Sequence, residues 1–183
     1  MSDGRCYPHC DADDRDRKAG SCRCYDKTMQ TIQPDIVVTD PDSGYLMVVE
    51  VNLSDSDHCV NQAIAHIKRL MTAVDCSMGL VVAGERLVLL RDSLELANGE
   101  SIKMVGEAKL PNSLLPPADE QWRGHPHLEF ESKVQGWLEN SKLTSNVDQL
   151  PDDLKELFSA SVMNLLRLGD IRAGGPRWRK LAG

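Results

Sequence analysis

Two short apolar runs, joined by a stretch of turn-forming residues, constrain this chain more than any other feature. The runs span residues 34–39 and 45–52, and the joining residues 40–44 read Asp-Pro-Asp-Ser-Gly. This pattern predicts a β-hairpin. Both runs are apolar almost throughout rather than alternating, which is typical of strands that are covered on both faces of a sheet.

Each strand of this hairpin carries one carboxylate. Asp35 stands at the start of the first run, and Glu50 lies inside the second run between Val49 and Val51. A charged carboxylate in an apolar strand costs several kcal/mol unless it has a partner. Strand pairing can bring the two acids to one end of the hairpin, and a shared Mg²⁺ is one such partner. The alternative is that Asp35 begins a turn after Pro34 and that Glu50 lies on an exposed edge strand.

The residues after the hairpin carry helix and strand patterns in turn. Apolar residues recur at helical spacing through residues 58–74, which predicts an amphipathic helix. Residues 79–83 and 86–90 predict two strands, joined by a tight turn at Gly84 and Glu85. Because crossover connections are right-handed, the first of these strands should lie beside the hairpin. The predicted fold class is therefore α/β, with a mixed central sheet flanked by helices.

The chain divides into three stretches by composition. Residues 1–28 form a polar segment that contains cysteines, and residues 29–110 form the α/β core. Residues 111–183 comprise a proline-rich connection, two helices and a basic tail. Within the core, residues 101–107 predict a further strand.

The C-terminal helical extension consists of a helix over residues 128–141 and a second that begins near Pro151 and stops at Gly169. We expect His125 and His127 to lie in the preceding loop rather than to bind a metal. The basic residues of the tail could contact phosphates, but a loose basic tail is the favoured interpretation.

Composition narrows the classes of protein that the chain can belong to. The 183 residues carry a formal net charge of −7, which argues against nucleic-acid binding through overall charge. The chain has no apolar run long enough to span a membrane and no signal-peptide pattern at its start, so we expect a cytoplasmic protein. In the cytoplasm its six cysteines should be reduced thiols or metal ligands rather than disulfides.

Most of the cysteines cluster near the N-terminus, at Cys6, Cys10, Cys22 and Cys24, with His9 beside them. Clustered thiolates can bind Zn²⁺. The spacing departs from the paired two-residue gaps of common zinc ribbons, so we favour a polar tail with incidental cysteines. A small zinc site stays open as the alternative.

The residues described so far match a known motif, and the matching positions are Pro34-Asp35, Glu50-Val51-Asn52, the helix at 58–74 and the strand at 79–83. This pattern resembles the PD-(D/E)XK nuclease superfamily, which has the restriction-endonuclease-like fold. The stretch 34–91 is most similar to the nuclease domain at the start of the R subunit of type I restriction enzymes. The resemblance implies hydrolysis of phosphodiesters, with DNA as the expected partner, in a defence or mobile-element system.

By this resemblance Asp35 and Glu50 would bind Mg²⁺, or Mn²⁺ in its place. The usual motif lysine is Asn52 here, and a neutral amide can orient a water only through hydrogen bonds. Gln62 would lie near the phosphate, because some branches of the superfamily carry Gln and Tyr at the spacing of Gln62 and His66. The alternative is that both residues lie on the solvated side of an amphipathic helix.

Two functions from different classes follow from these residues. The first is a Mg²⁺-dependent nuclease, for which the retained acidic pair is the argument. The second is a domain that keeps the nuclease fold without the chemistry and serves as a nucleic-acid-binding or protein-interaction module, with a protein partner or a second copy of the chain. The replaced lysine, the missing acidic helix upstream of the hairpin and the negative net charge favour this second function.

Overall fold

The computed structural model describes residues 33–96, 99–111, 114, 126–143 and 150–174 of the chain. The four N-terminal cysteines lie outside these ranges, and so does His125. The polar tail with incidental cysteines therefore stays the prediction, with the zinc site as its open alternative.

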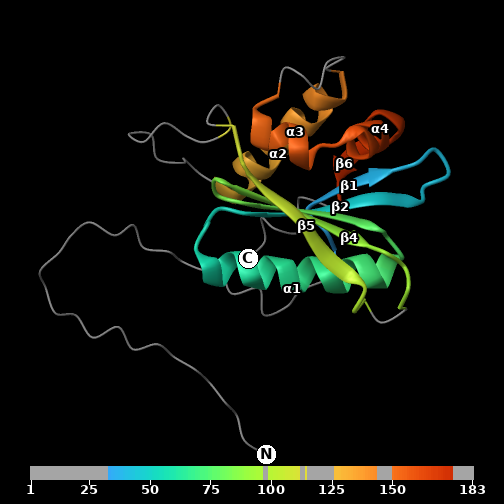
Figure 1. Cartoon of the computed structure of the whole chain (residues 1–183). Helices are drawn as coiled ribbons and strands as arrows, with labels where there is room; N and C mark the ends of the chain where they lie inside the picture. The colour runs from blue at the N-terminus through green and yellow to red at the C-terminus, as the bar shows by residue number, and fades with distance from the viewer. Residues whose placement is uncertain (1–32, 97–98, 112–113, 115–125, 144–149, 175–183) are drawn as a thin grey trace, which may run out of the picture.

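A six-stranded mixed sheet forms the centre of the fold, with the strand order β5-β4-β3-β2-β1-β6 (Figure 1). Only β2 and β3 are parallel, and every other pair of described neighbours is antiparallel. The strands are β1 (Ile36–Thr39), β2 (Tyr45–Asn52), β3 (Met78–Ala83), β4 (Arg86–Asp92), β5 (Ile102–Lys109) and β6 (Asp170–Ala173). The predicted α/β class with a mixed central sheet is confirmed.

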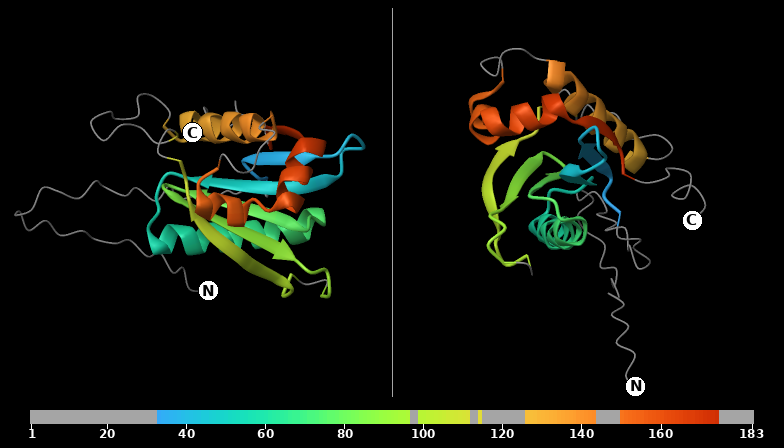
Figure 2. Two further views of the ribbon diagram at one scale, coloured as in Figure 1. Left: turned by 45° about the horizontal axis from the view of Figure 1, so that its top comes forward. Right: turned by 90° about the vertical axis from the view of Figure 1, so that its right-hand side faces the viewer.

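Helices cover both faces of this sheet, as the views in Figure 2 show. One face is covered by α1 (Asp57–Val74), which provides the crossover between the parallel strands β2 and β3. The other face is covered by α2 (Pro126–Leu143), α3 (Asp152–Leu157) and α4 (Ala160–Leu168). The described part of the C-terminal stretch therefore packs on the same sheet as the hairpin.

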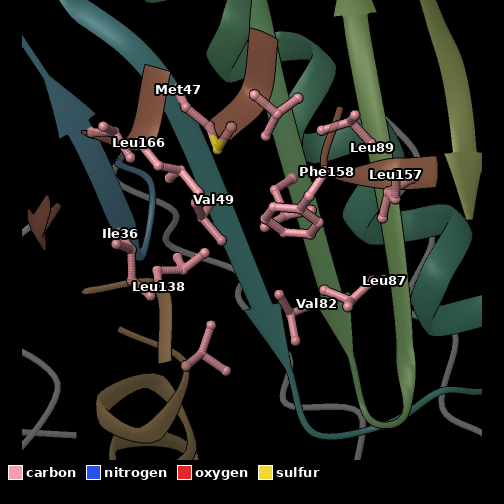
Figure 3. Close-up of a cluster of buried hydrophobic side chains, with 14 of the residues drawn as sticks. Ile36, Met47, Val49, Val82, Leu87, Leu89, Leu138, Leu157, Phe158 and Leu166 are labelled. Carbon is pink, nitrogen blue, oxygen red and sulfur yellow. The ribbon is translucent and has the colours of Figure 1, made fainter. Parts of the chain in front are cut away.

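The two faces of β2 explain its continuous apolar sequence. Met47 and Val49 belong to the apolar cluster beneath α2, α3 and α4, and Val48 belongs to the cluster beneath α1. Figure 3 shows the first of these two clusters, in which Phe158 and Leu138 lie over the sheet. Because side chains alternate along a strand, a strand with helices on both faces needs apolar residues at nearly every position.

The hairpin and the helix after it form where the sequence predicts them. Ile36 pairs with Val49, and the side chain of Asp40 in the turn accepts a hydrogen bond from the Gly44 amide. At the start of α1, the Ser56 hydroxyl accepts from the Cys59 amide, which satisfies one of the free N–H groups of the first turn. The predicted turn at Gly84 and Glu85 is also present, between β3 and β4.

The structure departs from the sequence prediction after Pro151. Where the sequence predicts one helix the structure has two, α3 and α4, because the chain turns between them at Phe158 and Ser159. Gly169 does end α4, but a strand follows at once: β6 pairs antiparallel with β1. Glycine is needed there because a Cβ would come within 2.2 Å of the Val38 side chain. The first residues of the expected basic tail thus complete one edge of the sheet.

The two cysteines among the described residues, Cys59 and Cys76, are both buried. Burial raises the pKa of the Cys76 thiol, so less of the reactive thiolate is present at a given pH. In a variant with the four N-terminal cysteines replaced by serine, we expect both thiols to react with a thiol-specific reagent at pH 8 more than about 100-fold slower than free cysteine, since labelling requires opening of the fold. Fast labelling before guanidinium is added would contradict this burial.

Candidate functional site

Asp35 lies at the open end of the hairpin, immediately before β1, and is buried with 5% of its surface exposed. Its backbone N–H donates to the Val49 carbonyl, and its carboxylate Oδ2 accepts from the Val51 amide at 2.9 Å. That amide belongs to the peptide group between Glu50 and Val51. The carboxylate of Asp35 therefore sits directly against the backbone of Glu50, at the end of the hairpin where the sequence analysis expects both acids.

Glu50 is also buried, and it is not on an edge strand, because β2 lies between β1 and β3. It alternates with Val49 and Val51, so its side chain is on the face that α1 covers. There its Oε2 lies 3.1 Å from Nδ1 of His66. The two atoms are at ion-pair distance, but the approach does not have hydrogen-bond geometry.

His66 was the least expected member of the site. Its side chain is buried with 6% exposure, so the alternative that places it on the solvated side of the helix is wrong for this residue. It lies next in sequence to Ile67, which packs in the core beneath α1, and its Nδ1 lies against the Glu50 carboxylate. Gln62, one helical turn earlier, is exposed to solvent. The pair Gln62 and His66 is therefore divided between the surface and the interior.

Asn52 follows Glu50 on β2 with its side chain half-buried. Its carbonyl Oδ1 accepts a hydrogen bond from the Ser54 amide at 3.1 Å, which shapes the loop between β2 and α1. An asparagine side chain that bonds the backbone two residues later is a common turn element. The amide NH₂ of Asn52 remains able to donate to a water or a phosphate oxygen.

The start of α2 brings two further ligand-type side chains to Asp35. His127 lies in the first turn of this helix, so its expected place in a loop is wrong. Glu131, which the sequence analysis did not single out, is 2% exposed, and its Oε1 lies 3.0 Å from Nδ1 of His127. One ligand atom from each of Asp35, His127 and Glu131 lies within 4.8 Å of the other two. The spacing of His127 and Glu131, four apart in a helix, was the available signal.

The donor set indicates what the site can hold. Carboxylate oxygens suit Mg²⁺ and Mn²⁺, and an imidazole nitrogen suits Mn²⁺ and Zn²⁺ better than Mg²⁺. Asp35 and Glu50 are both buried, but Glu50 faces α1 beside His66, whereas Asp35 lies with His127 and Glu131. Among the described residues, the donor set close enough for one divalent ion is therefore Asp35, His127 and Glu131, and an ion shared by Asp35 and Glu50 stays a prediction.

Comparison of the chain with models of known protein families, with curated proteins and with solved structures finds no match. The described helices include none long and apolar enough to cross a membrane.

Proposed function

We propose that this chain is a metal-dependent nuclease that hydrolyses DNA phosphodiesters, with a restriction-endonuclease-like core. The observation that carries the proposal is the 2.9 Å hydrogen bond from the Val51 amide to the Asp35 carboxylate, which holds one predicted metal ligand against the backbone of the other, Glu50. The element order of an antiparallel hairpin, a crossover helix and a parallel third strand supports the fold assignment.

Each residue would have a separate task in this reaction. Asp35 and Glu50 would hold Mg²⁺ or Mn²⁺, which polarises a phosphoryl oxygen and lowers the pKa of a water. The Val51 amide fixes one oxygen of Asp35 in place. Asn52 would orient the attacking water by donating its amide hydrogens, and it has no basic group with which to take a proton. His66 would hold the Glu50 side chain in its orientation.

A second function is favoured by two specific contacts. The Asn52 carbonyl is engaged by Ser54, and Glu50 is in contact with His66. A domain that has lost the chemistry and kept its polar groups for structure would have such contacts. It would serve as a nucleic-acid-binding or protein-interaction module.

The experiment that tests the proposal is cleavage of plasmid, linear and single-stranded DNA by the full chain with MgCl₂ or MnCl₂. We expect metal-dependent cleavage that falls more than about 100-fold in Asp35→Asn, because a neutral amide is a poor ligand for a hard cation. Asp42→Asn is the matched control, since Asp42 is exposed in the turn of the same hairpin, and it should cleave normally. If none of the DNA forms is cleaved with either metal, the nuclease proposal is wrong. A gel-shift with the same DNA then tests the second function.

A further inference from the structure

We propose that Asp35, His127 and Glu131 form a binding site for one divalent transition-metal ion, Mn²⁺ or Zn²⁺, which links α2 to the open end of the hairpin. The site deepens the proposed function in that it shares Asp35 with the hairpin pair. Its other two ligands come from a helix that the nuclease resemblance does not include.

The distances between the three side chains suit a common ion. Donor atoms bonded to one ion at about 2.1 Å lie about 3.0 Å apart when they are at right angles, and about 4.2 Å apart when they are opposite. His127 Nδ1 and Glu131 Oε1 are separated by 3.0 Å, which is the first of these distances. All three donors lie within 4.8 Å of one another, close to the larger of these distances, so small side-chain movements would bring them onto one ion.

Burial gives the second argument. The exposed fractions of Asp35 and Glu131 are only 5% and 2%. A divalent cation is attracted to both carboxylates, and this attraction is stronger in a buried site than in water. His127 is half-buried, so the site has one side through which an ion, a water or a phosphate can enter.

The backbone holds the ligands in place before an ion arrives. One oxygen of Asp35 is fixed by the Val51 amide, so the carboxylate has a defined orientation. His127 and Glu131 lie one turn apart on α2, an 18-residue helix whose apolar residues Phe130 and Val134 are buried against the sheet. Preformed donors on rigid elements favour binding because little side-chain freedom is lost.

The donor set also selects the metal. Mg²⁺ prefers oxygen ligands and retains several waters, so the imidazole should make it the weakest of the three ions. Mn²⁺ accepts one nitrogen with two carboxylates and keeps positions open for water, and Zn²⁺ binds the same three donors. In a direct binding measurement we expect the affinities for Zn²⁺ and Mn²⁺ to be higher than the affinity for Mg²⁺.

The test is binding of MnCl₂ to the full chain, measured by calorimetry and by electron paramagnetic resonance. We expect a bound Mn²⁺ with a nitrogen coupling in the resonance spectrum that His127→Gln removes. His127→Gln and Glu131→Gln should each weaken binding by about 100-fold, because even groups that only orient a ligand are worth about 10- to 100-fold in affinity. The matched control is Glu129→Gln, an exposed glutamate in the first turn of α2, which should bind Mn²⁺ as the wild type does.

ZnCl₂ is measured in the variant with Cys6, Cys10, Cys22 and Cys24 replaced by serine, so that N-terminal thiolates do not contribute. Circular dichroism establishes that each variant is folded. Unchanged Mn²⁺ affinity in His127→Gln and Glu131→Gln, with loss in Glu50→Gln, would overturn this site and leave the hairpin site of the nuclease proposal standing. No binding of either ion at millimolar concentration would also overturn it. Binding that depends on α2 in a chain that cleaves no DNA would support this site and contradict the nuclease proposal.

Discussion

Replacement of His66 by alanine should destabilise the fold by about 3 kcal/mol, one of the largest losses available from a single polar residue. The imidazole lies 3.1 Å from the Glu50 carboxylate, and the side chain of each residue is only 7% exposed. Removing the ring leaves a cavity beside that carboxylate and deletes the 3.1 Å contact, and breaking a buried pair by removing one partner is costly. Urea denaturation followed by circular dichroism at pH 7 measures the loss.

A double-mutant cycle separates the contact from the cavity. Glu50→Gln removes the charge at nearly constant volume, so His66→Ala should cost about 1–3 kcal/mol less in a Glu50→Gln background than in the wild type. The matched control is His58→Ala, because His58 is exposed on the same helix and should change stability by less than about 0.5 kcal/mol. Strictly additive effects of the two substitutions would mean that the pair does not interact.

The same cycle bears on the role of Glu50 in the nuclease proposal. A fold that tolerates Glu50→Gln while metal-dependent cleavage disappears would mean that the carboxylate is kept for the ion. If Glu50→Gln leaves cleavage unchanged, the pair with His66 is structural, and Glu50 is not a ligand.

Much of the sheet could be predicted because its central strands are defined by local sequence. β2 and β3 are buried on both faces, so nearly every residue in them is apolar, and the turns between elements contain Gly, Pro and Asp. The apolar face of α1 could also be predicted from local sequence, because it packs against one face of the sheet. Asp35 and Glu50 could be singled out because a carboxylate stands out in such strands.

The other half of the site depends on contacts between distant segments, which local patterns do not contain. His66 and Glu131 are polar residues on helices, and such residues are usually exposed. Whether they are buried is decided by Glu50 on the neighbouring strand and by the way that α2 packs on the sheet. Similarly, β6 has a single buried apolar residue, Ile171, and forms only because β1 offers it a free edge.

The break between α3 and α4 is only weakly indicated by the sequence. Ser159 is a residue type that favours the N-terminal cap of a helix, and it does occupy that position at the start of α4. The apolar residues on its two sides continue at helical spacing, which concealed the break. The reason for the break is Phe158, which leaves the helical path and turns into the core.

Phe158→Ala should therefore cause the largest loss of stability among the core residues of the α2–α4 face, about 3–5 kcal/mol. The ring is 2% exposed, and it contacts the Trp137 ring of α2 edge to face, with 5.5 Å between the ring centroids. Its removal leaves a cavity where α2, α3 and the sheet meet, and it also removes an aromatic pair worth about 0.5–1.5 kcal/mol. For a chain of this size the melting temperature should fall by about 10 °C.

Trp137 reports this change directly when Trp122 and Trp178 are replaced by phenylalanine, because its fluorescence then follows the packing of α2 against Phe158. Phe158→Leu should lose less than half as much stability, since leucine refills most of the volume. Leu168→Ala is the control on α4, where the side chain is 75% exposed, and it should lie within about 0.5 kcal/mol of the wild type. Equal losses from Phe158→Ala and Leu168→Ala would mean that α3 and α4 do not pack on the sheet as described. The α2 ligands His127 and Glu131 would then lose the support that holds them beside Asp35.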